Sequence, residues 1–258
     1  MKLVSKLPKW QLSFWSVLGM TTLLFGQACE PAFQTAAVDS VRAESLLSPE
    51  EKQACQAMSS AGAENPSANL SPNLQNITDL VSYLNTLPRP LQLHCVIAGL
   101  PRPLRLTAGF SSGSAQPSPG IKDPRIVLRV GNLLLGIVPD GPAKGSLEVG
   151  SLKTGDSAAR AEFLFPITEA VIQESAGLDH IRFGGGTSCG LCHNNETSAP
   201  SEPAAGVFQS KIIRFSPSER SSVTNVRTEA ELCRDNSSDR CLLLRSLFHD
   251  GSPIDSEY

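Results

Sequence analysis

The chain has 258 residues, a formal charge of −3 at neutral pH and 18% charged residues, with 20 glycines, 19 prolines and seven cysteines. That length suffices for one large domain or two small ones, and the many glycines and prolines indicate loops and short strands. The composition argues against collagen, a coiled coil or a polytopic membrane protein, and a mildly acidic chain without a Lys/Arg stripe argues against a nucleic-acid partner.

Residues 1–28 have the features of a signal peptide. Three lysines precede an apolar run over residues 12–25, which is too short for a comfortable membrane span, and small residues follow where cleavage would occur. Cys29 comes next, as in bacterial lipoproteins, although the two residues at 26–27 depart from the usual pattern. We expect export and lipidation of Cys29, in the periplasm or at the outer membrane; cleavage without acylation and a retained anchor helix stay open.

A tether over residues 29–47 and a helical segment over residues 48–106 are expected next. Ser48 starts a capping box that predicts a helix to about Ser59. Ser71-Pro72 is predicted to open a second helix, because apolar residues then recur at i, i+3, i+4 and i+7. Its expected core face consists of Ile77, Leu80, Val81 and Leu84.

A short repeat then occurs at residues 87–93 and 100–106, with six of seven positions identical. Its alternate prolines force extended backbone and remove hydrogen-bond donors, so each copy should enter an edge strand or an ordered loop. We expect its arginines, Arg89 and Arg102, on the surface.

Residues 107–178 are expected to form a β-rich core. Short apolar runs separated by Gly, Pro and Asp indicate an antiparallel sheet, and a strand within 207–215 and a helix from Ser238 are predicted further on. The fold class is therefore α+β, with residues 48–258 forming one globular unit. The predicted strands are 125–130, 132–138, 147–152, 160–165 and 168–173.

The C-terminal segment, residues 179–258, contains Cys189-Gly-Leu-Cys192-His193, the C-x-x-C-H arrangement of covalent c-type haem attachment. Two thiols at this spacing can add to the two vinyl groups on one porphyrin edge, and the next histidine then falls beneath the iron. We expect Cys189 and Cys192 to bind one haem c as thioethers and His193 to be the proximal iron ligand. The glycines at 184–186 would bring backbone close to this flat ligand.

The motif cysteines have three alternative uses. A zinc site would need a second close ligand pair, and a redox dithiol would need a thioredoxin-like frame; neither is evident. A plain Cys189–Cys192 disulfide stays open.

Four further cysteines follow Cys29 besides the motif pair. Export places them in an oxidising compartment, where free thiols are a liability. Among the three possible connectivities we favour Cys55–Cys95 and Cys233–Cys241.

Methionine is not expected as the sixth iron ligand, because none follows the motif and Met58 lies in the first predicted helix. His249 is favoured slightly over His180, and five-coordinate iron stays open. Two axial ligands suit electron transfer, whereas an open position suits ligand binding. No Ser-His-Asp, paired-carboxylate or metallohydrolase spacing stands out, so an enzyme is not favoured, and a haem-based enzyme or gas binder stays open as a third hypothesis.

The combination of an exported cysteine, the Leu-Pro-Arg-Pro-Leu segment, a β-rich middle, the C-x-x-C-H motif and the closing segment 240–249 resembles a family of bacterial envelope proteins with a single haem-type motif. The resemblance implies a haem protein and brings no substrate with it. The first hypothesis is a monohaem electron-transfer protein, anchored by lipid and serving a redox partner protein in the envelope. The alternative is a disulfide-stabilised lipoprotein that acts as a binding module without haem.

Overall fold

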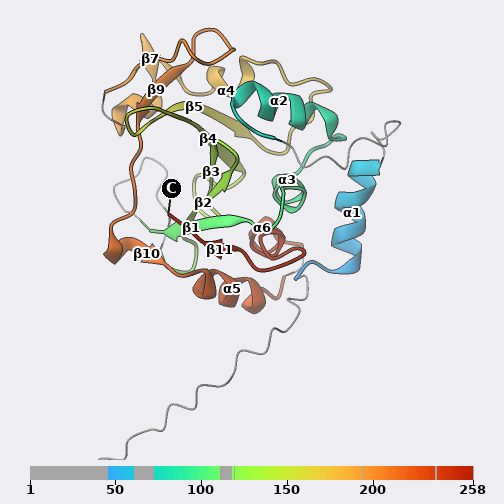
Figure 1. Cartoon of the computed structure of the whole chain (residues 1–258). Helices are drawn as coiled ribbons and strands as arrows, with labels where there is room; N and C mark the ends of the chain where they lie inside the picture. Colours follow the sequence, from blue (N-terminus) through green and yellow to red (C-terminus); the bar gives the residue numbers. More distant parts are fainter. Residues whose placement is uncertain are drawn as a thin grey trace, which may run out of the picture. The chain divides into compact units, whose positions relative to one another are not determined.

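A nine-stranded sheet organises the part of the chain that the computed structural model describes, which is residues 46–60, 73–110, 118, 120–193, 195–235 and 237–257 (Figure 1). The predicted signal peptide, Cys29 and nearly all of the predicted tether lie outside these residues. The described residues belong to one compact unit, Ser40–Tyr258. Among them, no helix combines the length and the apolarity that a membrane span requires.

Neighbouring strands of the sheet pair antiparallel, except that β11 (Ile254–Asp255) lies parallel to β1. Four of the predicted strands are present as β2 to β5, and part of the predicted 207–215 strand is present as β9. The predicted strand over 168–173 is not formed. The path through the sheet is β10 (Arg220–Ser221), β1 (Arg105–Gly109), β2 (Arg125–Val130), β3 (Leu133–Ile137), β4 (Ser146–Lys153), β5 (Ser157–Leu164), β9 (Phe208–Lys211) and β8 (Thr197–Ser198).

Two helices begin where local capping chemistry predicts. Ser48 and Glu51 exchange two bonds in the expected capping box, and the Ser238 hydroxyl accepts from the amide of Cys241. The second helix buries its predicted face, but its predicted start at Ser71-Pro72 is wrong: it starts at Ile77, because the Asn76 side chain caps it by accepting from the Asp79 amide. The helices are α1 (Pro49–Ser60), α2 (Ile77–Thr86), α3 (Leu93–Ala98), α4 (Ala176–Asp179), α5 (Val223–Leu232) and α6 (Asp239–Ser246).

The two faces of the sheet have different surroundings. Alternate side chains of β1 to β5 pack with α2, α3 and α6 into the main core, and Figure 1 shows these helices on one side of the strands. The opposite face carries a small apolar cluster that includes Val127, Leu134 and Ile212. This second face has little helical cover in the described structure, so it is the face on which a ligand site can form.

The repeated Leu-Pro-Arg-Pro-Leu segments end helices. Arg89 donates to the Leu84 carbonyl at 3.0 Å, at the end of α2, and both Arg-Pro bonds are cis. Arg102 donates to the carbonyls of Ile97 at 3.1 Å and Ser246 at 2.8 Å, at the ends of α3 and α6. The surface placement predicted for Arg102 is wrong, because its guanidinium satisfies helix-end carbonyls at the join between two helices.

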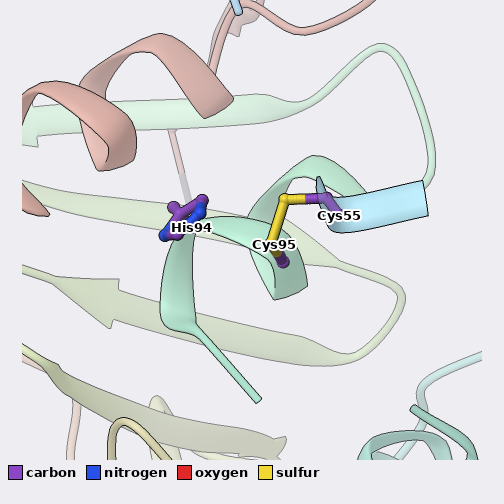
Figure 2. A group of neighbouring side chains, drawn as sticks. All are labelled: Cys55, His94 and Cys95. Carbon is purple, nitrogen blue, oxygen red and sulfur yellow. A yellow bond between two sulfur atoms is a disulfide. The ribbon is translucent and has the colours of Figure 1, made fainter. Parts of the chain in front are cut away.

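Two disulfides tie the helices together. Cys55 joins Cys95, which links α1 to α3 (Figure 2), and Cys233 joins Cys241 across the start of α6. These are the two pairs that the sequence favoured, and their Cα–Cα distances of 5.1 and 5.4 Å are normal for disulfides.

Candidate functional site

The C-x-x-C-H motif lies on one tight turn. A 3-10 helix, Ser188–Leu191, follows the hairpin formed by β6 (Arg182–Phe183) and β7 (Gly186–Thr187). The amides of Cys192 and His193 both donate to the Cys189 carbonyl, at 3.1 and 2.8 Å. Neither motif thiol is bonded to another cysteine, and Cys189 is half-buried while Cys192 is exposed. The turn therefore gathers two available thiols and one imidazole within five residues.

The His193 ring is held by the end of β9. Its Nδ1 lies 2.8 Å from the Lys211 carbonyl oxygen and 3.1 Å from an Arg160 Nη atom, which itself donates to that carbonyl at 2.8 Å. The carbonyl only accepts, so its bond to Nδ1 needs the tautomer with hydrogen on Nδ1, whereas the Arg160 guanidinium only donates and needs Nδ1 unprotonated. In the tautomer that bonds to Lys211, Nε2 keeps its lone pair for a metal. This is the usual way in which a protein orients a metal-ligating histidine.

The electrostatic surroundings keep His193 neutral. Burial and then the Arg160 guanidinium lower the pKa of His193 from the usual 6.5 to about 4. Burial raises the pKa of the Cys189 thiol, and a hydrogen bond with Thr187 offsets this in part. At neutral pH the turn thus presents an unprotonated imidazole, the form that binds metals.

A cavity of about 380 Å³ opens beside the motif on the less covered face of the sheet. Leu191, Cys192 and His193 line it from the motif, and Val127 and Leu134 line it from the sheet. Its volume falls within the range of small-molecule and cofactor pockets. The motif therefore lies at the edge of a concave, partly apolar surface.

Two glycines on adjacent strands, Gly136 of β3 and Gly150 of β4, belong to the cavity lining. The Arg125–Glu148 ion pair lies against Gly136, where an added Cβ would come within 3.4 Å of an Arg125 Nη atom and of a Glu148 carboxylate oxygen. A Cβ added at Gly150 would lie 3.3 Å from the Ala158 Cβ and 3.5 Å from an Arg160 Nη atom, so alanine would just fit and a larger side chain would fill the hollow. Neither glycine has a positive φ, so neither position requires glycine for its backbone conformation.

Three arginines and two glutamates, Glu148 and Glu219, give the cavity a charged lining. Arg125 forms an ion pair with Glu148, and Arg214 forms one with Asp156 at 2.5 Å. The third, Arg160, donates through Nε to the Ser210 hydroxyl at 3.0 Å. Guanidinium groups held in fixed positions are the side chains best suited to bind the carboxylates of a ligand.

Glu196 is the main site residue that sequence reasoning missed. Its carboxylate accepts from the Thr187 amide at 2.8 Å and from the Thr187 hydroxyl, just before the motif turn. Gly184 and Gly185, which belong to the glycine run expected to approach a flat ligand, form the β6–β7 turn, with Gly184 at φ +58°. Nothing in the sequence singled out Glu196, since its partner lies on the other side of the motif.

The predicted distal histidines do not line this cavity. His180 is exposed at the C-terminal end of α4, and the Nε2 atom of His249 lies 3.0 Å from an Asp250 carboxylate oxygen. Burial lowers the pKa of His249, and the Asp250 charge opposes this shift. Among the described residues that line the cavity, His193 is the one histidine.

A second Cys–His group occurs at the junction of α1 and α3. One ligand atom each from Cys55, His94 and Cys95 lies within 4.8 Å of the others (Figure 2). The two sulfurs form a disulfide, so they offer no thiolate, and burial lowers the pKa of His94. In this oxidised form the group is a structural cross-link beside a histidine.

No protein-family model, curated protein or solved structure matches the chain. The site is therefore interpreted from its own geometry and chemistry.

Proposed function

We propose that the protein is an exported, cell-envelope monohaem c-type protein that transfers electrons. Cys189 and Cys192 hold the haem as thioethers, and His193 is the proximal iron ligand. The observation that carries the proposal is the neutral His193 ring on a turn with two thiols outside any disulfide. Cys192 and His193 line the cavity, and Cys189 lies on the same turn outside the lining. When bound, haem c supplies an iron that changes its redox state.

The residues around the motif fit such a group. Thiol, thiol and imidazole are the donor set that covalent haem requires. Val127 and Leu134 give part of the cavity an apolar lining for the porphyrin ring. Arg125, Arg160 and Arg214 would be the partners for the two carboxylates that haem carries, in competition with Glu148 and Asp156 for two of these arginines. An apolar patch beside fixed arginines suits a ligand with an apolar ring and an acidic edge.

The cavity lining supports an open sixth position rather than histidine ligation. His193 is the one histidine on the described lining, while His180 and His249 lie elsewhere. An open position would let the haem bind small ligands as well as carry an electron, whereas a histidine from outside the lining would give the two axial ligands that suit electron transfer better. Carbon monoxide added to the reduced protein should therefore shift its absorption spectrum at once.

The envelope assignment rests on three features. The sequence has an export signal and a cysteine at the expected cleavage point, and the structure contains two disulfides. Disulfides persist in oxidising compartments such as the periplasm. A lipid on Cys29 would hold the protein at the membrane, within reach of a redox partner protein.

The test is co-expression of the full chain with a haem-attachment system, followed by intact mass measurement. Covalent haem adds roughly 600 Da and a Soret band that survives acid-acetone extraction. The double variant Cys189→Ala, Cys192→Ala should lose both, while His180→Asn, a histidine change away from the cavity, should retain both. A wild-type protein without added mass under these conditions contradicts the proposal.

Filling the cavity provides a second test. Gly150→Phe should reduce covalent haem strongly, because the ring would occupy the cavity, whereas Gly150→Ala should leave attachment near the wild-type level. If the wild type instead retains a small acidic compound noncovalently and no haem, the binding-module alternative is favoured. Equal haem content in the two Gly150 variants would place the haem outside this cavity.

A further inference from the structure

We propose that Glu196 is a positioning residue that holds the C-x-x-C-H turn in the shape needed for attachment through both cysteines. The inference rests on the proposed haem function. It concerns a side chain outside the motif, which contacts the turn and does not take part in the attachment chemistry. Glu196 is half-buried, and it follows His193 by three residues.

The first support is the pair of hydrogen bonds to Thr187. This threonine is 5% exposed and immediately precedes the 3-10 helix of the motif. Both its amide and its hydroxyl donate to the Glu196 carboxylate, one to each oxygen. Charge-assisted bonds of this kind are about twice as strong as neutral ones. The start of the turn is therefore fixed by a residue that comes after its end.

The second support is the close approach of the carboxylate to glycine backbone. A Cβ placed on Gly190 would lie 2.9 Å from a Glu196 carboxylate oxygen, and a Cβ placed on Gly186 would overlap the same carboxylate. Gly190 is one of the two residues between the motif cysteines. The absence of a side chain there allows Glu196 to pack directly against the turn.

The third support is that Glu196 is connected to the sheet. It directly precedes β8, whose Thr197 pairs with Gln209 of β9. The far end of β9 supplies the Lys211 carbonyl that holds His193. Strand β9 therefore fixes the histidine directly and fixes the start of the turn through Glu196. The spacing between the thiols and the imidazole is set by this common support.

Attachment through both cysteines depends on that spacing. Each thiol adds its S–H across one vinyl C=C: sulfur bonds to the carbon next to the ring, hydrogen goes to the terminal carbon, and no electrons are gained or lost. The first addition fixes one edge of the ring, so the second thiol must already lie opposite the other vinyl group. A loosened turn should therefore allow the first addition and slow the second.

The experiment compares Glu196→Ala and Glu196→Gln with Glu174→Ala, an exposed glutamate, in full chains co-expressed with the attachment system. In Glu196→Ala we expect at least about a tenfold slower second addition, since misplacement by an ångström costs about that much or more. A protein with one thioether keeps one conjugated vinyl group, which moves its pyridine haemochrome band to longer wavelength. Glu196→Gln keeps an acceptor for Thr187 and should be intermediate, and Glu174→Ala should match the wild type.

A measurement on haem-free protein separates this inference from the proposed function. In the wild type, exposed Cys192 should be alkylated faster than half-buried Cys189, and Glu196→Ala should bring the two rates closer. If the wild type never takes up haem, the function fails while this ratio still tests the turn. An unchanged haemochrome band together with an unchanged alkylation ratio in a folded Glu196→Ala protein would overturn the role of Glu196.

Discussion

Acidification should destabilise the haem-free protein through His193. Burial and the Arg160 charge lower the pKa of this histidine from the usual 6.5 to about 4. Between these two pH values the unfolded chain binds a proton at His193 that the folded protein does not bind. The free energy of unfolding therefore has its full value above pH 6.5 and falls as the pH drops toward 4.

The size of this effect follows from the pKa difference. At 1.36 kcal/mol for each pH unit, the gap between 6.5 and about 4 gives roughly 3 kcal/mol as an upper bound. His193 is partly exposed, and solvent screens its interaction with the Arg160 guanidinium. We therefore expect about half of that value, roughly 1.5 kcal/mol, between pH 7 and pH 4.

The free energy of unfolding can be measured by urea unfolding followed by circular dichroism. Tryptophan fluorescence does not serve here, because the chain beyond residue 28 contains no tryptophan. The comparison is between the wild type and His193→Gln at a series of pH values from 4 to 7. The difference in unfolding free energy between them should shrink by about 1.5 kcal/mol on going to pH 4. Arg160→Gln should reduce this change. Parallel profiles for the wild type and His193→Gln would refute the reasoning.

Two further predictions concern the scaffold. Replacing Cys55 and Cys95 by serine should lower the free energy of unfolding by about 4 kcal/mol, and replacing Cys233 and Cys241 should lower it by about 2.5 kcal/mol. The difference arises because loop-closure entropy grows with the sequence separation, which is 40 for the first pair and 8 for the second. Chemical denaturation of the two double variants should give that order, and the reverse order would contradict it. Arg102→Ala should lower the free energy of unfolding by about 3 kcal/mol, because the half-buried guanidinium donates to carbonyls at the ends of both α3 and α6. A thermal midpoint within a degree of the wild type would contradict this and would show that water replaces these bonds.

The elements that the sequence predicted are those whose causes are local. The capping box at Ser48 and Glu51 and the N-cap at Ser238 involve residues within four positions of each other, so the local sequence predicted the starts of α1 and α6. Helix α5 was missed, because only Val226 and Ala230 on it are buried, which is too weak a periodic pattern. Helix α3 was missed because it is only six residues long and follows a proline-rich segment.

The candidate site divides in the same way. The motif residues, the two disulfide pairs and the absence of a downstream methionine follow from residue types and spacing. The fold brings strands beside the motif that carry the Lys211 carbonyl, the Arg160 guanidinium and the lining glycines Gly136 and Gly150. Their roles depend on contacts across many residues, which no local pattern records. Glu196 is the near exception, since it lies close in sequence but acts across the turn.

The sequence by itself determined the chemistry that is available: a C-x-x-C-H turn, an even set of remaining cysteines, an α+β pattern and a leader typical of export. Tertiary structure alone decided that the turn lies beside a cavity, that a β9 carbonyl orients His193, and that His180 and His249 do not line this cavity. The physical reason is that spacing along a chain sets which groups can react together. Which of these groups lie around the same cavity is set by the register of strands that pair only in the folded protein.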